Sequence, residues 1–150
     1  MKKACVCTVV IFLFGVMPVI VQAQNTIIGK VKGTRGIVSI LREGRTKPAF
    51  PNDQIFLSDT IMTGSNGAIG ILLEDNTLIS MGPISRVSME KFKFVPSENE
   101  YEMRLHMMQG TFVYQSGLLG KLAPNAVELE TPVGRISMLK GTDFKAKFSQ

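Results

Sequence analysis

The chain has 150 residues, of which 45% are hydrophobic and 19% are charged, and its formal net charge is +5. This length fits a single domain that is large enough to bury a hydrophobic core. Both cysteines, Cys5 and Cys7, lie close to the N-terminus. The rest of the chain therefore has no thiol for a disulfide or a thiolate site, and neither cysteine stands where a lipid is attached.

The N-terminal segment has the pattern of a secretory signal peptide. Two lysines precede an uncharged apolar run, Pro18 follows that run, and the small residue Ala23 stands at the expected cleavage point. We therefore expect residues 1–23 to be a cleaved signal peptide and residues 24–150 to form the mature domain, in the periplasm or secreted from a bacterial cell. The apolar run is also nearly long enough to cross a bilayer, so an uncleaved anchor is the alternative.

Export bears on the expected partners. Cleavage removes two lysines, which leaves the mature chain only modestly basic. An exported protein of modest charge gives no reason to expect a nucleic-acid partner. The densest basic zone, residues 30–47, suits anionic lipid head groups or an acidic cell-wall polymer, although a solvated strand face is the simpler explanation.

Beyond residue 24 the hydrophobic pattern has a period of two, with turn residues at about every eight to twelve positions. This pattern predicts an all-β fold, either a β-sandwich or a short solenoid-like twin-sheet structure, and it contains no convincing helix. Strands are predicted over residues 27–32, 36–42, 68–73, 78–81, 86–94, 101–107, 111–115, 127–131, 135–139 and 143–148. Residues 44–53 contain two prolines, which would remove donors from a ladder, and therefore predict a loop.

Two local features of this pattern are specific. Residues 68–73 and 78–81 flank Asp75 and Asn76, which can adopt the positive φ of a tight hairpin turn. The apolar alternation of residues 86–94 changes phase near Glu90, which predicts a β-bulge there.

A set of residues in fixed order extends over most of the chain. The set begins with an acidic residue ahead of a Thr-Gly step. An apolar strand and an Asp-x-Thr turn follow. The set ends with Thr-Pro and, further along the chain, a basic residue directly followed by Gly-Thr-x-Phe. The members of the set are Asp59, Thr63, Gly64, Asp75, Asn76, Thr77, Thr131, Pro132, Lys140, Gly141, Thr142 and Phe144. In this order they resemble the FecR domain family over about residues 28–148. Asn76 stands where that family has Gly, and Lys140 where it has Arg, but Asn tolerates the turn and Lys keeps the charge.

The resemblance implies a function in the bacterial envelope. FecR proteins are best known as sensors whose periplasmic domain receives a signal from an outer-membrane transporter and passes it to a cytoplasmic region that controls a sigma factor. Only residues 1–3 precede the apolar segment, so we expect the binding role of the domain without the transduction. The implied role is a protein-interaction or signal-relay module, and the implied partner is another envelope protein, such as a transporter or sensor component.

A binder of cell-wall or surface polysaccharide is the alternative. Such a binder calls for exposed aromatic platforms, yet the chain has no Trp, and Tyr101 and Tyr114 both fall at apolar-face positions.

Catalytic chemistry finds little support, so we expect no enzyme activity and no cofactor. The only histidine, His106, follows Arg104 on the polar face of a strand, where we expect a surface position. Met103 and Met107 would face the side of that strand opposite to His106, which argues against a copper site. We find no zinc or iron ligand set either. The carboxylates in turn-forming sequence are Asp53, Asp59, Glu74 and Asp75, which we expect to bond neighbouring backbone.

The longest irregular stretch, residues 116–126, is the candidate binding loop. It combines Leu118, Leu119 and Leu122 with glycines, and loops of this kind often carry function. We expect these leucines to contact a partner, and the alternative is that at least two of them fold back onto the core. Exposed sheet edges are the second candidate surface.

Overall fold

The computed structural model of the protein describes residues 26–137 and 143–148. The predicted signal peptide lies outside these ranges, as do Lys140, Gly141 and Thr142 of the closing signature, so both remain predictions. Within the described ranges, no helix has the length and hydropathy needed to cross a membrane.

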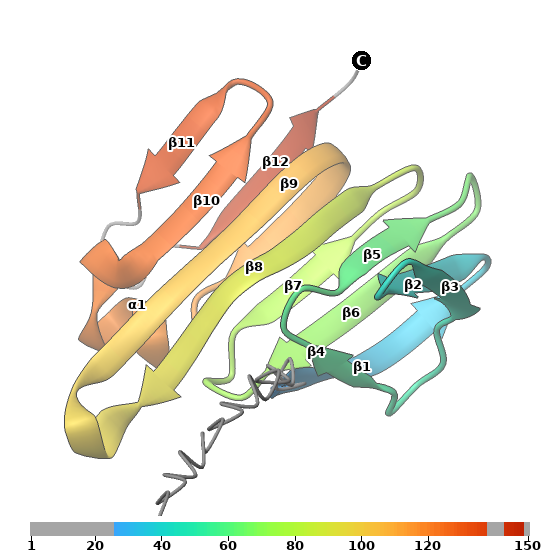
Figure 1. Ribbon diagram of the computed structural model, residues 1–150. Coiled ribbons are helices and arrows are strands. Elements are labelled where there is room, and N and C mark those ends of the chain that lie inside the picture. The colour runs from blue at the N-terminus through green and yellow to red at the C-terminus, as the bar shows by residue number, and fades with distance from the viewer. Residues whose placement is uncertain (1–25, 138–142, 149–150) are drawn as a thin grey trace, which may run out of the picture.

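The described residues form a curled β-structure in which the strands belong to one sheet (Figure 1). The strands are β1 (Ile27–Arg35), β2 (Val38–Arg42), β3 (Arg45–Pro48), β4 (Gln54–Phe56), β5 (Thr60–Thr63), β6 (Ala68–Leu73), β7 (Leu78–Met81), β8 (Arg86–Val95), β9 (Glu100–Gln115), β10 (Val127–Thr131), β11 (Gly134–Ser137) and β12 (Phe144–Phe148). The predicted all-β class is therefore confirmed.

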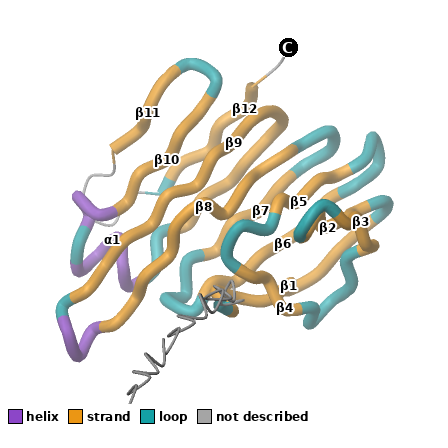
Figure 2. Tube along the Cα trace, viewed as in Figure 1, coloured by secondary structure: helices purple, strands orange, loops and turns teal. Residues whose placement is uncertain are grey.

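Short helical turns interrupt the strands, which corrects the expectation that the chain contains no helix. They are η1 (Pro96–Glu98), α1 (Leu118–Leu122) and η2 (Pro124–Ala126), seen as the purple segments of Figure 2. Both 3-10 turns begin with a proline, whose fixed φ suits the first helical position.

Strand β9 joins the two halves of the curled sheet. Its first half pairs with β8 in antiparallel and with β10 in parallel orientation, whereas its second half pairs with β7 and β12. Gly110 lies between the halves with a φ of +105°, and a Cβ at this position would clash with Ser85. The two layers suggested by the sequence are consequently parts of one continuous sheet, because a single strand runs through both.

The core fills the space inside the curl. Along the first half of β9 the buried apolar side chains are those of Met103, Leu105 and Met107, which have odd numbers. Along the second half they are those of Phe112 and Tyr114, which have even numbers. The phase changes where the register of β8 and β9 shifts beside Arg86. Both runs therefore face the same core, although a strictly alternating strand would place them on opposite sides.

Several sequence predictions can be compared directly with the strands. The hairpin of β6 and β7 is confirmed, with Asn76 at a φ of +66°. The bulge is confirmed too, because the register of β8 shifts between Met89 and Lys91. The loop predicted for residues 44–53 is partly wrong, since β3 forms within it. Pro48 is tolerated because β3 pairs with β2 alone among the described strands, as an edge strand does.

Burial of Tyr114 predicts a loss of stability in alkaline solution. The side chain has no exposed surface, and this burial raises the pKa of its phenol from the usual 10 to about 12. Because the pKa is higher in the folded state, the full stability is present below pH 10 and is lost as the pH rises to 12. A shift of this size corresponds to about 2 to 3 kcal/mol. Urea denaturation across this pH range measures the loss.

The Tyr114→Phe variant is the control for this pH effect, since it keeps the ring and removes the titrating group. It should lose less stability than the parent between neutral and alkaline pH. Equal losses in the two proteins would show that another group causes the alkaline transition.

Candidate functional site

The signature residues within the described ranges lie at separate turns of the sheet and do not form one site. Asp59 precedes β5, Thr63 and Gly64 close β5, Asp75 to Thr77 connect β6 with β7, and Thr131 closes β10.

Asp59 is a fully buried carboxylate that holds the turn between β4 and β5. It accepts hydrogen bonds from Nε and Nη2 of Arg42, both at 2.7 Å, and from the Phe56 amide at 2.8 Å. Arg42 also lies 4.0 Å above the ring of Phe56. The hydrogen bond to Asp59 raises the pKa of Arg42. The sequence placed Arg42 in a solvated basic zone, whereas the structure makes it the partner of a buried acid.

Asp75 connects the β6–β7 turn to the start of α1. Its carboxylate accepts the Thr77 amide at 3.1 Å, the Thr77 hydroxyl at 2.7 Å and the Leu119 amide at 3.2 Å. Its carbonyl accepts the Leu118 amide at 2.7 Å, and the Gly117 amide donates to Oγ1 of Thr77 at 3.1 Å. The turn signature therefore positions the segment that the sequence identified as a binding loop.

The candidate binding loop is an ordered helical turn with one leucine in the core. Leu119 has no exposed surface, which overturns its assignment to a binding surface, because a buried side chain cannot contact a partner. Leu118 and Leu122 are 44% and 57% exposed. The alternative of two buried leucines is also wrong, since only one of the three is buried.

The remaining signature residues also contact neighbouring turns and strands. Oγ1 of Thr63 donates to the Gly82 carbonyl at 2.7 Å, and Oγ1 of Thr131 donates to the Gly134 carbonyl at 2.7 Å. Phe144 of β12 stacks on Tyr114 with ring centroids 5.4 Å apart. Pro132 is exposed in the β10–β11 turn. These residues close turns and attach β12, so the described part of the signature has a structural role.

The carboxylates expected to bond backbone largely do so. Asp53 accepts the Phe50 amide at 3.1 Å, and Asp59 and Asp75 accept the amides described above. These bonds explain why acidic residues occupy the turns.

Four strands have a single partner among the described residues, and they differ in how open their edges are. β3 contains Pro48, β4 has only 3 residues, and β12 exposes Lys145 and Lys147. Proline, shortness and lysine all discourage pairing with another strand. β11, with 4 residues, contains neither proline nor lysine. Its one charged residue, Arg135, is already paired with Glu128 and Glu130 at 2.9 Å each.

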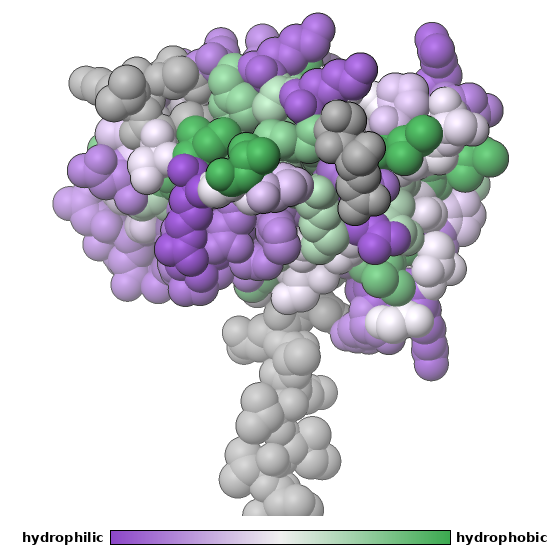
Figure 3. Space-filling view, turned by 90° about the horizontal axis from the view of Figure 1, so that it is seen from above, coloured by the Kyte–Doolittle hydropathy of each residue, from purple (hydrophilic) through white to green (hydrophobic). Residues whose placement is uncertain are grey.

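Exposed large apolar side chains are scattered. Among the residues that the structure describes they are Ile27, Ile37, Phe50, Ile84, Leu118, Leu122 and Val133, of which Val133 is the most exposed at 84%. On the face seen in Figure 3, hydrophobic residues form small separate patches among hydrophilic ones. Val133 lies in the turn between β10 and β11, next to the open edge.

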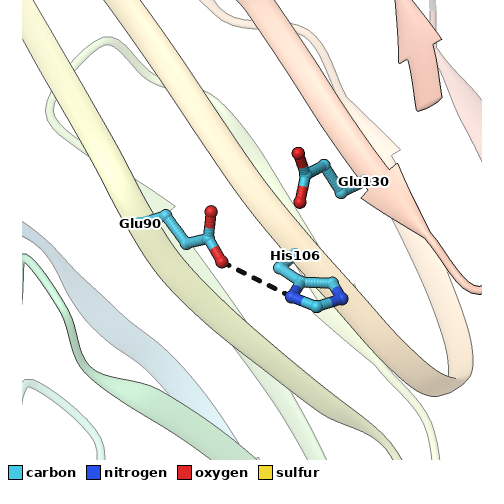
Figure 4. A group of neighbouring side chains, drawn as sticks. All are labelled: Glu90, His106 and Glu130. Atoms are coloured by element: carbon cyan, nitrogen blue, oxygen red, sulfur yellow. Dashed lines mark ion pairs between the residues drawn. The ribbon is translucent and has the colours of Figure 1, made fainter.

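His106 lies on the polar face of β9, as predicted, and Met103 and Met107 are buried on the opposite face. It has two acidic neighbours from adjacent strands, Glu90 on β8 and Glu130 on β10 (Figure 4). This cluster was not predicted from the sequence. Its only local sign was the bulge at Glu90.

The two tyrosines give no support to a carbohydrate platform. Tyr114 is buried, and Tyr101 is half-buried with its ring centroid 6.0 Å from that of Phe94.

The comparison with protein families is consistent with this arrangement. A family model described as FecR protein matches residues 59–150, more than half of the chain. The matched range starts at the buried Asp59 and includes every signature residue. No curated protein and no solved structure matches the chain.

Proposed function

The chain belongs to the FecR family, and from this we propose that it is a non-enzymatic envelope module that binds another envelope protein and relays a signal. Family membership supports a signalling-related role. The sequence pattern of residues 1–23 supports export to the periplasm or beyond.

The single observation that carries the binding role is the open edge of β11. An edge strand presents unpaired backbone donors and acceptors, which an extended segment of a partner can complete by adding a strand. β11 runs from Gly134 to Ser137 and, within the described ranges, pairs with β10 alone. The exposed side chain of Val133 adds an apolar contact beside this edge.

A protein partner is favoured over a polysaccharide. Strand addition uses backbone hydrogen bonds, which a polypeptide supplies and a sugar chain does not. Neither tyrosine is a fully exposed platform for stacking, because Tyr114 is buried and Tyr101 is half-buried beside Phe94.

Site-specific photo-cross-linking in cells that produce the full chain tests the proposal. A photoreactive residue at Val133 or at Ser137 should form a cross-link to one envelope protein, recovered from the envelope fraction and identified by mass spectrometry. The same residue at Thr46 on the β3 edge, or at Leu122 on α1, should give no such product, because these positions lie on other elements.

Introducing a negative charge beside the β11 edge, and at an exposed position elsewhere, gives a matched pair of variants. Val133→Asp should reduce the cross-link from Ser137 by about tenfold, whereas Ile37→Asp, at a side chain that is 68% exposed, should leave it unchanged. Both substitutions should alter stability by less than about 0.5 kcal/mol, as surface changes usually do. Cross-links that form equally from β3 and β11 would refute the β11 edge as the binding surface, and a product found only in the cytoplasm would refute export.

A further inference from the structure

Three potential metal ligands lie side by side on one face of the sheet. Glu90, His106 and Glu130 come from the adjacent strands β8, β9 and β10, and one ligand atom of each lies within 4.8 Å of the other two (Figure 4). His106 and Glu130 are direct register partners in the parallel β9–β10 pair. Glu90 occupies the bulge of β8. Bulges re-aim side chains, and here the bulge turns Glu90 toward the imidazole.

The separation of His106 and Glu90 suits a shared ion better than a hydrogen bond. Nδ1 of His106 and Oε1 of Glu90 lie 3.4 Å apart, beyond the usual length of a hydrogen bond. Two ligands that each lie about 2.1 Å from a tetrahedral zinc ion are about 3.4 Å from one another. The ligand atom of Glu130 lies within 4.8 Å of those of His106 and Glu90.

The surroundings allow an ion to enter. The side chains of His106, Glu90 and Glu130 are 38%, 35% and 23% exposed. The ion would therefore retain contact with water, and a water molecule could complete its coordination as in other three-ligand sites. Two carboxylates balance the charge of a divalent cation.

We propose that Glu90, His106 and Glu130 form a binding site for one divalent transition-metal ion, for which zinc is the best fit. An imidazole nitrogen combined with two carboxylate oxygens suits zinc, whereas magnesium and calcium prefer oxygen ligands alone. No zinc ligand set could be recognised from the sequence, because these residues are far apart along the chain and meet only when β8 and β10 both pair with β9.

Arg135 competes with the ion for Glu130. Its Nη2 lies 2.9 Å and its Nε 3.1 Å from Oε1 of Glu130. Both contacts use the same oxygen, so the other carboxylate oxygen can turn toward His106. An ion bound at this site would nevertheless share the charge of Glu130 with the guanidinium. Removal of Arg135 should therefore strengthen metal binding. If His106 bound the ion alone, without Glu130, removal of Arg135 would not be expected to have this effect.

The single histidine of the chain makes the test direct. The full chain, without a histidine tag and with Cys5 and Cys7 replaced by serine to remove thiols, is titrated with zinc chloride while the imidazole resonances of His106 are followed by NMR. We expect a saturable shift at one ion per chain. Glu90→Gln and Glu130→Gln should each weaken binding about tenfold or more, and Arg135→Ala should tighten it severalfold.

Glu102→Gln is the matched control. This glutamate lies on the same strand as His106 and is 47% exposed, but it pairs with Lys91 and not with the imidazole. It should bind zinc as the parent does. Absence of a His106 shift in the parent would overturn the proposal. Parent-like affinity in both Glu90→Gln and Glu130→Gln, with circular dichroism showing that both are folded, would also overturn it.

Discussion

The Leu119→Asp substitution is expected to leave little folded protein. Leu119 has no exposed surface, and loss of a buried leucine side chain costs about 2 to 5 kcal/mol. Burying an unpaired carboxylate adds several kcal/mol more. The new charge would also lie near an existing one, because the Leu119 amide donates to the Asp75 carboxylate at 3.2 Å. The sum reaches the total stability of about 5 to 15 kcal/mol that is usual for a domain.

Leu122→Asp is the matched control for this prediction, since it makes the same change on the same helical turn at a side chain that is 57% exposed. It should alter the free energy of unfolding by less than about 1 kcal/mol. Urea denaturation followed by circular dichroism compares the two variants. A Leu119→Asp protein with the midpoint of the parent would show that this leucine is not in the core.

The Asp59→Ala substitution should cost about 3 to 5 kcal/mol, because it removes one partner of a buried ion pair. Asp59 is fully buried, and its loss leaves the Phe56 amide without its acceptor and Arg42 with the Gln54 carbonyl, at 3.0 Å, in place of its counterion. Arg42→Ala should cost at least as much, since it leaves the fully buried Asp59 carboxylate without its counterion, whereas the Arg42 side chain left by Asp59→Ala is 24% exposed and can be partly solvated. Thermal and urea denaturation of the purified variants measure both effects.

A double-mutant cycle isolates the pair. The combined Arg42→Ala and Asp59→Ala variant should lose less stability than the two single variants together, since removal of both charges leaves neither one buried alone. The control pair is Lys91 and Glu102, each 47% exposed, for which the same cycle should give less than about 1 kcal/mol. Additive effects at Arg42 and Asp59 would contradict the buried pair.

Local patterns predicted a large part of the fold. The period-two alternation of Met103, Leu105 and Met107 identified the buried face of β9, and the Asp-Asn turn identified the β6–β7 hairpin. The change of phase near Glu90 identified the bulge. Each of these signals is contained within about ten neighbouring residues, which is why the sequence alone was sufficient.

Predictions failed where the surroundings outweigh the local pattern. Residues 45–48 form β3 despite Pro48, because at an edge the missing donor costs no ladder bond. Residues 118–122 form a helical turn because Asp75, distant in sequence, accepts the amide of Leu119 and binds the Leu118 amide through its carbonyl. No short window of sequence contains that acceptor.

By itself, the sequence determined the all-β class, the positions of most strands and the family, since alternation and turn residues are local properties. Only the tertiary structure decided which side chains meet. β9 pairs with four different strands, and those pairings bring Glu90 and Glu130 to His106 and attach Phe144 to Tyr114. Alternation specifies which residues share a face of one strand, but it does not specify which strand lies beside it. The ion pair of Arg42, the burial of Leu119 and the open edge of β11 all depend on which strands and loops lie beside one another.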